Sequence, residues 1–239
     1  MIEFFSLILG AYFLGSVPAA YLIGRWTRGI DIRQYGSGNV GAANISAVIS
    51  GRWTIPVTIF DLGKGILVVY LARLIGLDVY QQVLIGIAAI TGHNWPIFLR
   101  FSGGRGILTT AGVIFGLAPW LALAITIVTL LFAPFRQLPM GALLVLAATP
   151  LCSWFHAQTF RIEQPLPITL GCVIIFLLVA IRRLTVSRTK LSTLTPTREL
   201  VMNRLLFDRD IKDRETWTKR TPPKVNSTEK PLDLSAKKK

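Results

Sequence analysis

The feature that most constrains the fold is the scarcity of charge in the first three quarters of the chain. Residues 1–181 of the 239-residue sequence contain 15 charged side chains, whereas residues 182–239 contain 23. A soluble domain of that size needs many more charged side chains to cover its surface. The distribution therefore excludes an ordinary cytosolic globular protein, and it predicts a multi-span membrane domain followed by a basic aqueous tail.

The same distribution excludes several other classes of protein. The formal net charge is +14, but most of the excess lies in the tail rather than over a folded groove, which argues against nucleic-acid binding. Cys152 and Cys172 stand alone in apolar runs, so neither a disulfide framework nor a metal site is expected. The N-terminal apolar segment carries Glu3 where a secretion signal would be basic, so we interpret it as a retained span.

Seven membrane spans are predicted. A spanning helix needs about 20 mostly apolar residues. The uncharged run between Arg105 and Arg136 is too long for one span, and Ala118-Pro119 lies inside it, so we expect two short helices there. The fold class is thus an all-α polytopic membrane helical bundle with about seven transmembrane helices, occupying residues 1–185. The expected spans are 2–24, 54–76, 79–98, about 106–118, about 120–135, 138–158 and 165–181.

Basic residues gather on one side of the membrane under this topology. The loop 25–53 and the tail share that side, and only Arg73 and Arg161 fall on the other. The positive-inside rule then places the N-terminus outside and the tail in the cytoplasm. We expect the tail, 186–239, to be partly disordered, with a short helix within 197–217 and an attraction to anionic lipid headgroups. Because all motifs lie upstream, we expect deletion of 190–239 to leave any activity largely intact.

The first polar motif is a glycine-rich segment after the first span. Function is expected where such sequence interrupts apolar spans, because polar groups are costly in lipid. Gly36, Gly38 and Gly41 spell G-x-G-x-x-G, but membrane spans flank them instead of a strand and a crossover helix, so a dinucleotide site is excluded. Glycines let backbone N–H groups converge on a phosphate, with Ser37 and Asn39 as extra donors. A plain turn is the alternative.

Two further motifs lie inside or at the ends of spans. Asp61 and Lys64 share a helix face, and the sequence fits a self-paired buried ion pair as well as it fits contact with a substrate. His93 lies in Gly92-His93-Asn94-Trp95-Pro96 at the end of a span. No Asp follows it at the spacing of an H-x-x-x-x-D acyltransferase, and a lone histidine is more often structural than catalytic.

The fourth motif, Gly103-Gly104-Arg105-Gly106, opens a helix and is the most specific on physical grounds. Free N–H groups, the helix dipole and a guanidinium all attract a phosphate at a helix N-terminus. No G-x-S-x-G elbow occurs, so a serine acyl-enzyme has no support. Two phosphate-type loops on one face of a membrane bundle indicate an enzyme or binder of lipid-linked phosphate compounds.

In this order the motifs resemble the bacterial acyl-phosphate:glycerol-3-phosphate acyltransferases. The resemblance covers about residues 1–120 and is carried by Gly15-Ser16-Val17-Pro18, 36–44, Asp61-x-x-Lys64-Gly65, 92–98 and 101–106. It implies seven spans in the bacterial inner membrane, with the N-terminus outside and the motifs at the cytoplasmic face. It also implies acyl transfer from acyl phosphate to the sn-1 hydroxyl of glycerol 3-phosphate, giving lysophosphatidic acid in phospholipid synthesis.

The resemblance assigns roles to individual residues. Acyl phosphate, glycerol 3-phosphate and membrane lipids are the implied partners, with no cofactor, no metal and no nucleic acid. Ser37 and Arg105 are the implied catalytic residues, because the reaction of an activated anhydride asks the site to position phosphates and neutralise charge. The implied substrate-binding residues are Gly36, Gly38, Asn39, Gly41, Asn44, Lys64, His93, Gly103, Gly104 and Gly106.

Some positions depart from the family pattern. Ala43, Ala47, Pro139, Ala142 and Val186 stand where family members have polar side chains. These departures leave an alternative open: a non-catalytic relative that binds phospholipid or acyl phosphate as a regulatory or scaffold protein. A small-anion transporter is a third reading, but the sequence lacks the paired broken helices expected of inverted repeats.

Overall fold

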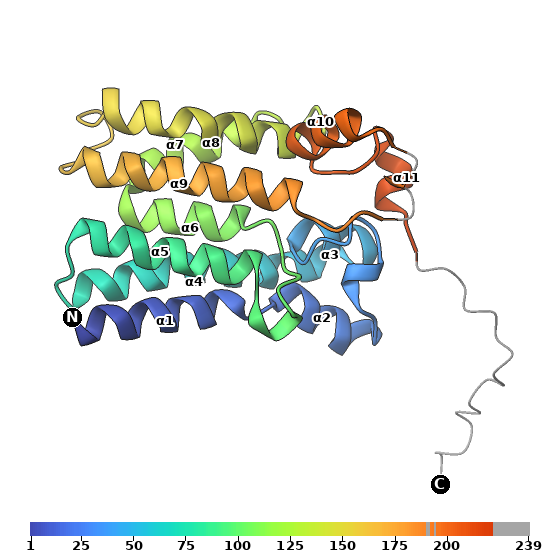
Figure 1. Cartoon of the computed structure of the whole chain (residues 1–239), viewed down its shortest axis with the longest axis horizontal. Coiled ribbons are helices and arrows are strands. Elements are labelled where there is room, and N and C mark those ends of the chain that lie inside the picture. The colour runs from blue at the N-terminus through green and yellow to red at the C-terminus, as the bar shows by residue number, and fades with distance from the viewer. Residues whose placement is uncertain (190–191, 194, 222–239) are drawn as a thin grey trace, which may run out of the picture.

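All the regular secondary structure in the described part of the chain is helical, which confirms the predicted all-α class (Figure 1). The computed structural model describes residues 1–189, 192–193 and 195–221. The helices of the bundle are α1 (Ile2–Ser16), α4 (Thr54–Leu74), α5 (Val79–Asn94), α6 (Ile107–Leu117), α7 (Pro119–Leu130), α8 (Leu138–Phe155) and α9 (Pro165–Leu184). Shorter elements are α2 (Ala19–Arg28), α3 (Ala42–Val48), α10 (Thr197–Phe207), α11 (Arg214–Thr218) and the 3-10 turns η1 (Ile32–Gln34), η2 (Gly51–Trp53) and η3 (Ile97–Leu99).

Five segments are long and apolar enough to cross a membrane, and they correspond to the five single stretches predicted. They are Ile2–Arg28, Gly51–Leu74, Val79–Leu99, Leu138–Phe155 and Pro165–Leu184. The predicted break at Ala118-Pro119 is confirmed, because Ala118 leaves the helical region and Pro119 begins α7. Since α6 and α7 are each shorter than a standard span, the count of seven stays a prediction.

The first segment is interrupted, although the sequence predicts a single helix there. Val17 has extended backbone angles and Pro18 precedes α2, so α1 and α2 are two helices rather than the single one expected over 2–24. A proline restricts the residue before it to extended conformations. Residues 15–19 around the break line a small pocket together with Val40, which lies in the loop that follows α2.

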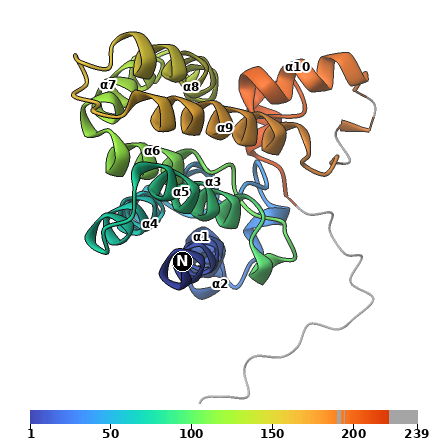
Figure 2. The same ribbon diagram turned by 60° about the vertical axis from the view of Figure 1, so that its left-hand side comes forward.

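The bundle has a distinct polar end. In Figures 1 and 2 the seven bundle helices lie side by side, with the N-terminus at one end and α2, α3, α10 and α11 gathered at the other. Helix α5 is central, since it contacts α1, α4, α6 and α9. Large apolar side chains such as Leu9, Ile59 and Leu177 are exposed on the outside, as expected for a surface that faces lipid. The polar end therefore holds the aqueous segments, and the site must be sought there.

Glycines set the distance between neighbouring helices. A Cβ at Gly15 would overlap the backbone of Ala89, and one at Gly92 would overlap the backbone of Tyr12, so α1 and α5 touch along their backbones. Gly112 makes the same kind of contact between α6 and α4. Small residues permit this close approach in membrane proteins, where dispersion contacts rather than hydrophobic transfer stabilise the helix pair. The polar ends of α4, α5 and α6 are thereby fixed relative to one another.

Replacing Gly92 with leucine is expected to destabilise the bundle. The new side chain would have to push α1 away from α5, and overpacking of a tight contact costs about 1–3 kcal/mol or more. Gly63→Leu is the matched control, because Gly63 is also helical and has open space around its Cβ direction. The melting temperature in detergent micelles should fall markedly for Gly92→Leu and stay near that of the parent for Gly63→Leu. Equal falls in both variants would contradict this account of the contact.

The described residues after α9 fold back against the bundle. Helix α10 contacts α8 and α9, and the guanidinium of Arg183 donates to the carbonyl oxygens of Leu205 (2.5 Å) and Pro139 (2.7 Å). Arg204 pairs with Asp210 at 2.7 Å and donates to Leu184 O at 2.8 Å. These bonds attach the segment 197–210 to the end of the bundle.

A helix lies within the expected range 197–217 and occupies its first half. Helix α10 ends at Phe207, where Asp208 takes a left-handed conformation, and α11 is separate. Leu200, Asn203 and Arg204 are buried, whereas Val201 is 37% exposed. Polar side chains can be buried here because they are hydrogen-bonded. The predicted disorder at the end of the tail falls on 222–239, outside the described residues.

Candidate functional site

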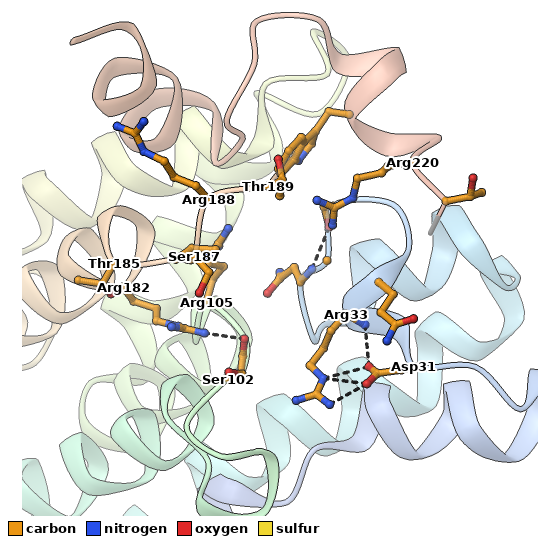
Figure 3. A pocket seen from close by; sticks show the side chains of 18 of the residues that line it. Asp31, Arg33, Ser102, Arg105, Arg182, Thr185, Ser187, Arg188, Thr189 and Arg220 are labelled. Carbon is orange, nitrogen blue, oxygen red and sulfur yellow. Dashed lines mark hydrogen bonds and ion pairs between the residues drawn. The ribbon is translucent and has the colours of Figure 1, made fainter. Parts of the chain in front are cut away.

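A cavity of about 1590 Å³ opens at the polar end of the bundle. Figure 3 shows it between two walls, with Asp31, Arg33 and Arg220 on one and Arg105 and Arg182 on the other. The first wall comes from the loop after α2 and from the segment around α11. The second comes from the loop before α6, from the last turn of α9 and from residues 185–189. The site is thus assembled from four separate parts of the chain.

Basic side chains dominate the lining of the cavity. Against two acidic residues, Asp31 and Glu215, the lining includes Arg33, Arg105, Arg182, Arg188, Lys219 and Arg220. Guanidinium groups bind phosphate oxygens through paired charge-assisted hydrogen bonds. The cavity is therefore suited to a ligand with one or more phosphate groups.

Arg105 lies at the N-terminus of α6, as the sequence predicted. It lines the cavity while being only 6% exposed. The adjacent N-cap residue, Gly106, has a φ of +73°, a conformation that favours glycine. The Nε atom of Arg105 lies 2.5 Å from Oδ1 of Asp208, in the tail. This ion pair fixes one edge of the guanidinium, a contact that no motif in the sequence indicated.

Arg182 forms the other part of the same wall, although it is not among the site residues predicted from the sequence. Its guanidinium donates to the carbonyl oxygens of Gly104 (2.9 Å) and Gly103 (2.8 Å) and lies 5.7 Å from the ring centroid of Trp95. These carbonyls orient the side chain without neutralising its charge. The signal available in the sequence was the pair of arginines that ends the last span.

The neighbouring Arg183 has a different role. It is 1% exposed and bonds to the tail and to α8, as described above, rather than lining the cavity. Val186, one of the positions that depart from the family pattern, lines the cavity with an apolar side chain. Arg183 is therefore a structural attachment for α10.

The glycine-rich loop differs from the predicted phosphate cradle. The N–H groups of Gly36, Ser37, Gly38 and Asn39 already donate, respectively, to Arg220 O, Asn44 Oδ1, Tyr35 O and Ser37 Oγ. They are therefore not a free array of donors for an anion. What the loop offers the cavity are the side chains of Ser37 and Asn39 and the backbone of Gly38, and Asn39 Oδ1 is buried without a hydrogen-bond partner among the described residues.

Gly36, Gly41 and Asn44 maintain the shape of the loop and do not line the cavity. The amide of Asn44 donates to Ile32 O and Tyr35 O, which holds the turn together. Gly36 has a φ of +54°, and Gly41 is the N-cap of α3. Any part they take in substrate binding would therefore be indirect.

Asp31 and Arg33 are paired within the first wall. The guanidinium of Arg33 donates to both carboxylate oxygens, at 2.7–3.2 Å, and also to Leu99 O. Burial alone would raise the pKa of Asp31, but the hydrogen bonds and charge of Arg33 hold that pKa below its ordinary value. Asp31 is consequently a poor proton acceptor, and much of the Arg33 charge is neutralised.

Lys64 and His93 lie inside the bundle and do not line the large cavity. Lys64 Nζ lies 2.9 Å from Asp61 Oδ1 and 2.9 Å from His93 Nδ1, and it donates to Gly15 O at 3.0 Å. Because an ammonium has no lone pair, His93 Nδ1 must be the acceptor, which assigns the ring proton to Nε2 when the ring is neutral. Of the two readings left open for Asp61 and Lys64, the geometry favours the self-paired cluster.

The cluster nevertheless supports the cavity wall. Gly103 and Gly104 pack on His93 and Pro96 so tightly that a Cβ at either would overlap them, and the N–H of Gly104 donates to His93 O at 3.1 Å. Gly106 approaches the side chain of Asn94 in the same way. Of the predicted residues, Ser37, Gly38, Asn39, Gly103 and Arg105 therefore meet at the cavity, and Gly104, Gly106, Lys64 and His93 lie directly behind it.

The tail contributes more to the site than the sequence indicated. Residues 215–217 and 219–221 line the cavity, and Asp208 pairs with Arg105. We expected deletion of 190–239 to leave activity largely intact because the sequence motifs lie upstream. The structure changes that expectation, since the deletion would remove part of a wall and the carboxylate that orients Arg105.

Comparison with known proteins identifies related chains. A family model described as glycerol-3-phosphate acyltransferase matches residues 5–191. Glycerol-3-phosphate acyltransferase 4 of Dehalococcoides mccartyi (strain CBDB1) is 41% identical over 217 residues, covering 91% of this chain and 94% of that protein. Glycerol-3-phosphate acyltransferase of Synechococcus sp. (strain CC9902) is 47% identical over 115 residues, covering 47% of this chain and 58% of that protein.

Solved structures give the same result. The crystal structure of PlsY (YgiH), an integral membrane glycerol 3-phosphate acyltransferase, in its glycerol 3-phosphate form matches with a TM-score of 0.68 and 28% identity. The lysophosphatidic acid form of PlsY matches with a TM-score of 0.66. Each alignment covers 76% of this chain and 88% of the other.

Proposed function

This chain belongs to the glycerol-3-phosphate acyltransferase family, and from that premise we propose that it transfers a fatty acyl group from acyl phosphate to the sn-1 hydroxyl of glycerol 3-phosphate. The family resemblance inferred from the motifs is confirmed, and the protein is a multi-pass membrane protein. The observation that carries the proposal is the arginine-lined cavity at the polar end of an apolar bundle. There a membrane-anchored acyl chain and a water-soluble phosphate can meet.

The proposed reaction needs no nucleophile from the protein. The sn-1 oxygen of glycerol 3-phosphate attacks the carbonyl carbon of the mixed anhydride, the bond from that carbon to the phosphate oxygen breaks, and inorganic phosphate leaves. Of the two carboxylates in the described lining, Asp31 is tied to Arg33 and Glu215 to Lys219. We therefore infer that the hydroxyl proton passes to an oxygen of the departing phosphate.

The cations of the second wall would stabilise the charge that develops on that phosphate. Arg105 and Arg182 are both oriented before a ligand arrives, one by Asp208 and the other by backbone carbonyls. Preorganised donors of this kind supply most of the rate enhancement in many reactions that develop anionic charge. Ser37 and Asn39 face them across the cavity and would contribute hydrogen bonds to the bound substrates.

A direct assay tests the proposal. The purified protein in detergent micelles, given palmitoyl phosphate and glycerol 3-phosphate, should form lysophosphatidic acid and inorganic phosphate in equal amounts. Palmitoyl-CoA in place of palmitoyl phosphate should give little product. If neither donor gives any product, the acyltransferase function is refuted. Binding of palmitoyl phosphate without turnover would favour the alternative, a non-catalytic relative. The observation that supports this alternative is the ion pair between Arg105 and Asp208, because the carboxylate offsets the charge of the arginine.

The proposed location is the bacterial inner membrane, with the cavity and the tail on the cytoplasmic side. Reporter fusions after Arg52, Arg105 and Lys239 should all give cytoplasmic signals, because basic residues gather on the cytoplasmic side. A fusion after Gly76, in the loop between α4 and α5, should give the opposite signal and serves as the control. An external signal at Lys239 together with a cytoplasmic one at Arg52 would show that α6 and α7 do not make two separate crossings.

A further inference from the structure

The segment 217–221, beyond the region that matches the family model, lies against the glycine-rich loop. The N–H of Gly36 donates to Arg220 O at 2.7 Å. A Cβ at Gly38, whose φ is +72°, would lie 2.6 Å from Arg220 Nη2, and a Cβ at Gly36 would lie 3.2 Å from Thr218 O. The absence of side chains at Gly36 and Gly38 is what allows this close approach. The two glycines therefore allow the tail to pack closely against the first wall of the cavity.

Arg220 is placed so that its side chain serves the cavity. Its guanidinium lies 5.0 Å from the ring centroid of Trp217, which supports it from one side. Its Nε is buried without a hydrogen-bond partner, and no carboxylate lies within ion-pair distance of it among the described residues. Burial lowers the pKa of Arg220 and the more distant charge of Asp210 raises it. A buried donor of this kind gains from an anionic ligand.

The other cations of the first wall are already paired with carboxylates. Arg33 is paired with Asp31, and Lys219 is paired with Glu215. Arg220 is thus the cation of the first wall that has an unused buried donor and faces the cavity, as Figure 3 shows.

The two walls suit different substrates. The second wall begins at α6 and α9, next to the apolar helices, and suits the phosphate of a ligand whose acyl chain lies in the membrane. The first wall is built from the loop after α2 and from 215–221, both of them segments outside the apolar spans. A small water-soluble phosphomonoester would reach this wall from the aqueous side.

We propose that Arg220 binds the phosphate of glycerol 3-phosphate, with Trp217 holding its guanidinium in place. The proposal rests on the acyl-transfer function proposed above. It makes the C-terminal segment a part of the substrate site and not only an aqueous extension. The family model ends at residue 191, so this binding residue would be an addition to the residues of the matched region.

Kinetics of Arg220→Ala in the full-length protein test the proposal. The KM for glycerol 3-phosphate should rise about tenfold to a hundredfold, the scale of losing one charge-assisted hydrogen bond, while kcat and the KM for palmitoyl phosphate change little. Arg220→Lys should recover part of the loss, because the charge returns without the paired donors. A merely structural role would instead move both KM values and the melting temperature.

The matched control is Arg214→Ala. Arg214 is the first residue of α11, close to Arg220 in the sequence, and has the same side chain, but it is exposed and does not line the cavity. This variant should behave as the parent does. An unchanged KM for glycerol 3-phosphate in Arg220→Ala, or a rise only in the KM for palmitoyl phosphate, would overturn the proposal.

Direct binding separates failure of this proposal from failure of the enzymatic function. If the parent shows no turnover, the acyltransferase function fails, and equilibrium binding of labelled glycerol 3-phosphate then decides the role of Arg220. Binding by the parent and by Arg214→Ala, with a tenfold or greater loss in Arg220→Ala, supports the proposal. Equal binding by all three, or no binding by the parent, overturns it.

Discussion

Replacing Arg105 with alanine is expected to lower kcat by about 10²–10³. The variant would lose a preorganised guanidinium at the N-terminus of α6, and one such donor is worth about 3–4 kcal/mol of transition-state stabilisation. It would also leave Asp208 without its partner, an uncompensated carboxylate that repels phosphate. Arg105→Lys should recover much of the rate, because the charge returns at the same helix N-terminus even though the paired donors do not.

Arg100→Ala is the control for this measurement. Arg100 precedes the same loop, but it is exposed and does not line the cavity. Initial rates with both substrates saturating should separate the two variants by at least a factor of ten. Turnover in Arg105→Ala equal to that of the parent would refute the assignment of Arg105 to the reacting phosphate.

Replacing Lys64 with alanine is expected to cost about 3–5 kcal/mol of stability. Asp61 and Lys64 have side chains that are 3% and 1% exposed, inside the bundle. Removing one partner leaves the other charge buried without compensation, which is the costly case for a buried ion pair. Loss of the lysine would also free His93, which contacts Gly103 and Gly104 behind the cavity. Activity should therefore fall together with stability.

The double variant Asp61→Ala/Lys64→Ala provides the comparison. With both charges gone no ion is left unpaired, so its melting temperature in detergent should lie above that of Lys64→Ala alone. If the double variant loses as much stability relative to the parent as the two single variants lose in sum, the two residues act independently. Retained stability in Lys64→Ala would contradict the ion pair itself.

A site residue could be predicted when the reason for its position lies in the residues next to it in the sequence. Arg105 was predictable because a glycine-rich turn and a cation at a helix start are encoded within a few adjacent residues. Arg182 and Arg183 were not distinguishable in the same way. They are adjacent in sequence, and the turn of about 100° per residue in a helix sends one to the cavity and the other to α10. Only the packing of α9 fixes which is which.

The sequence by itself determined the membrane class, the five long apolar segments and the break at Pro119. These follow from the length of apolar runs and from proline stereochemistry, which act over one helix at a time. Only the tertiary structure decided that the N–H of Gly36 donates to Arg220 O, with Arg220 lying against Gly38, and that Asp208 pairs with Arg105. Such contacts join residues more than 100 positions apart. They depend on how the helices and the tail pack together, which no local pattern encodes.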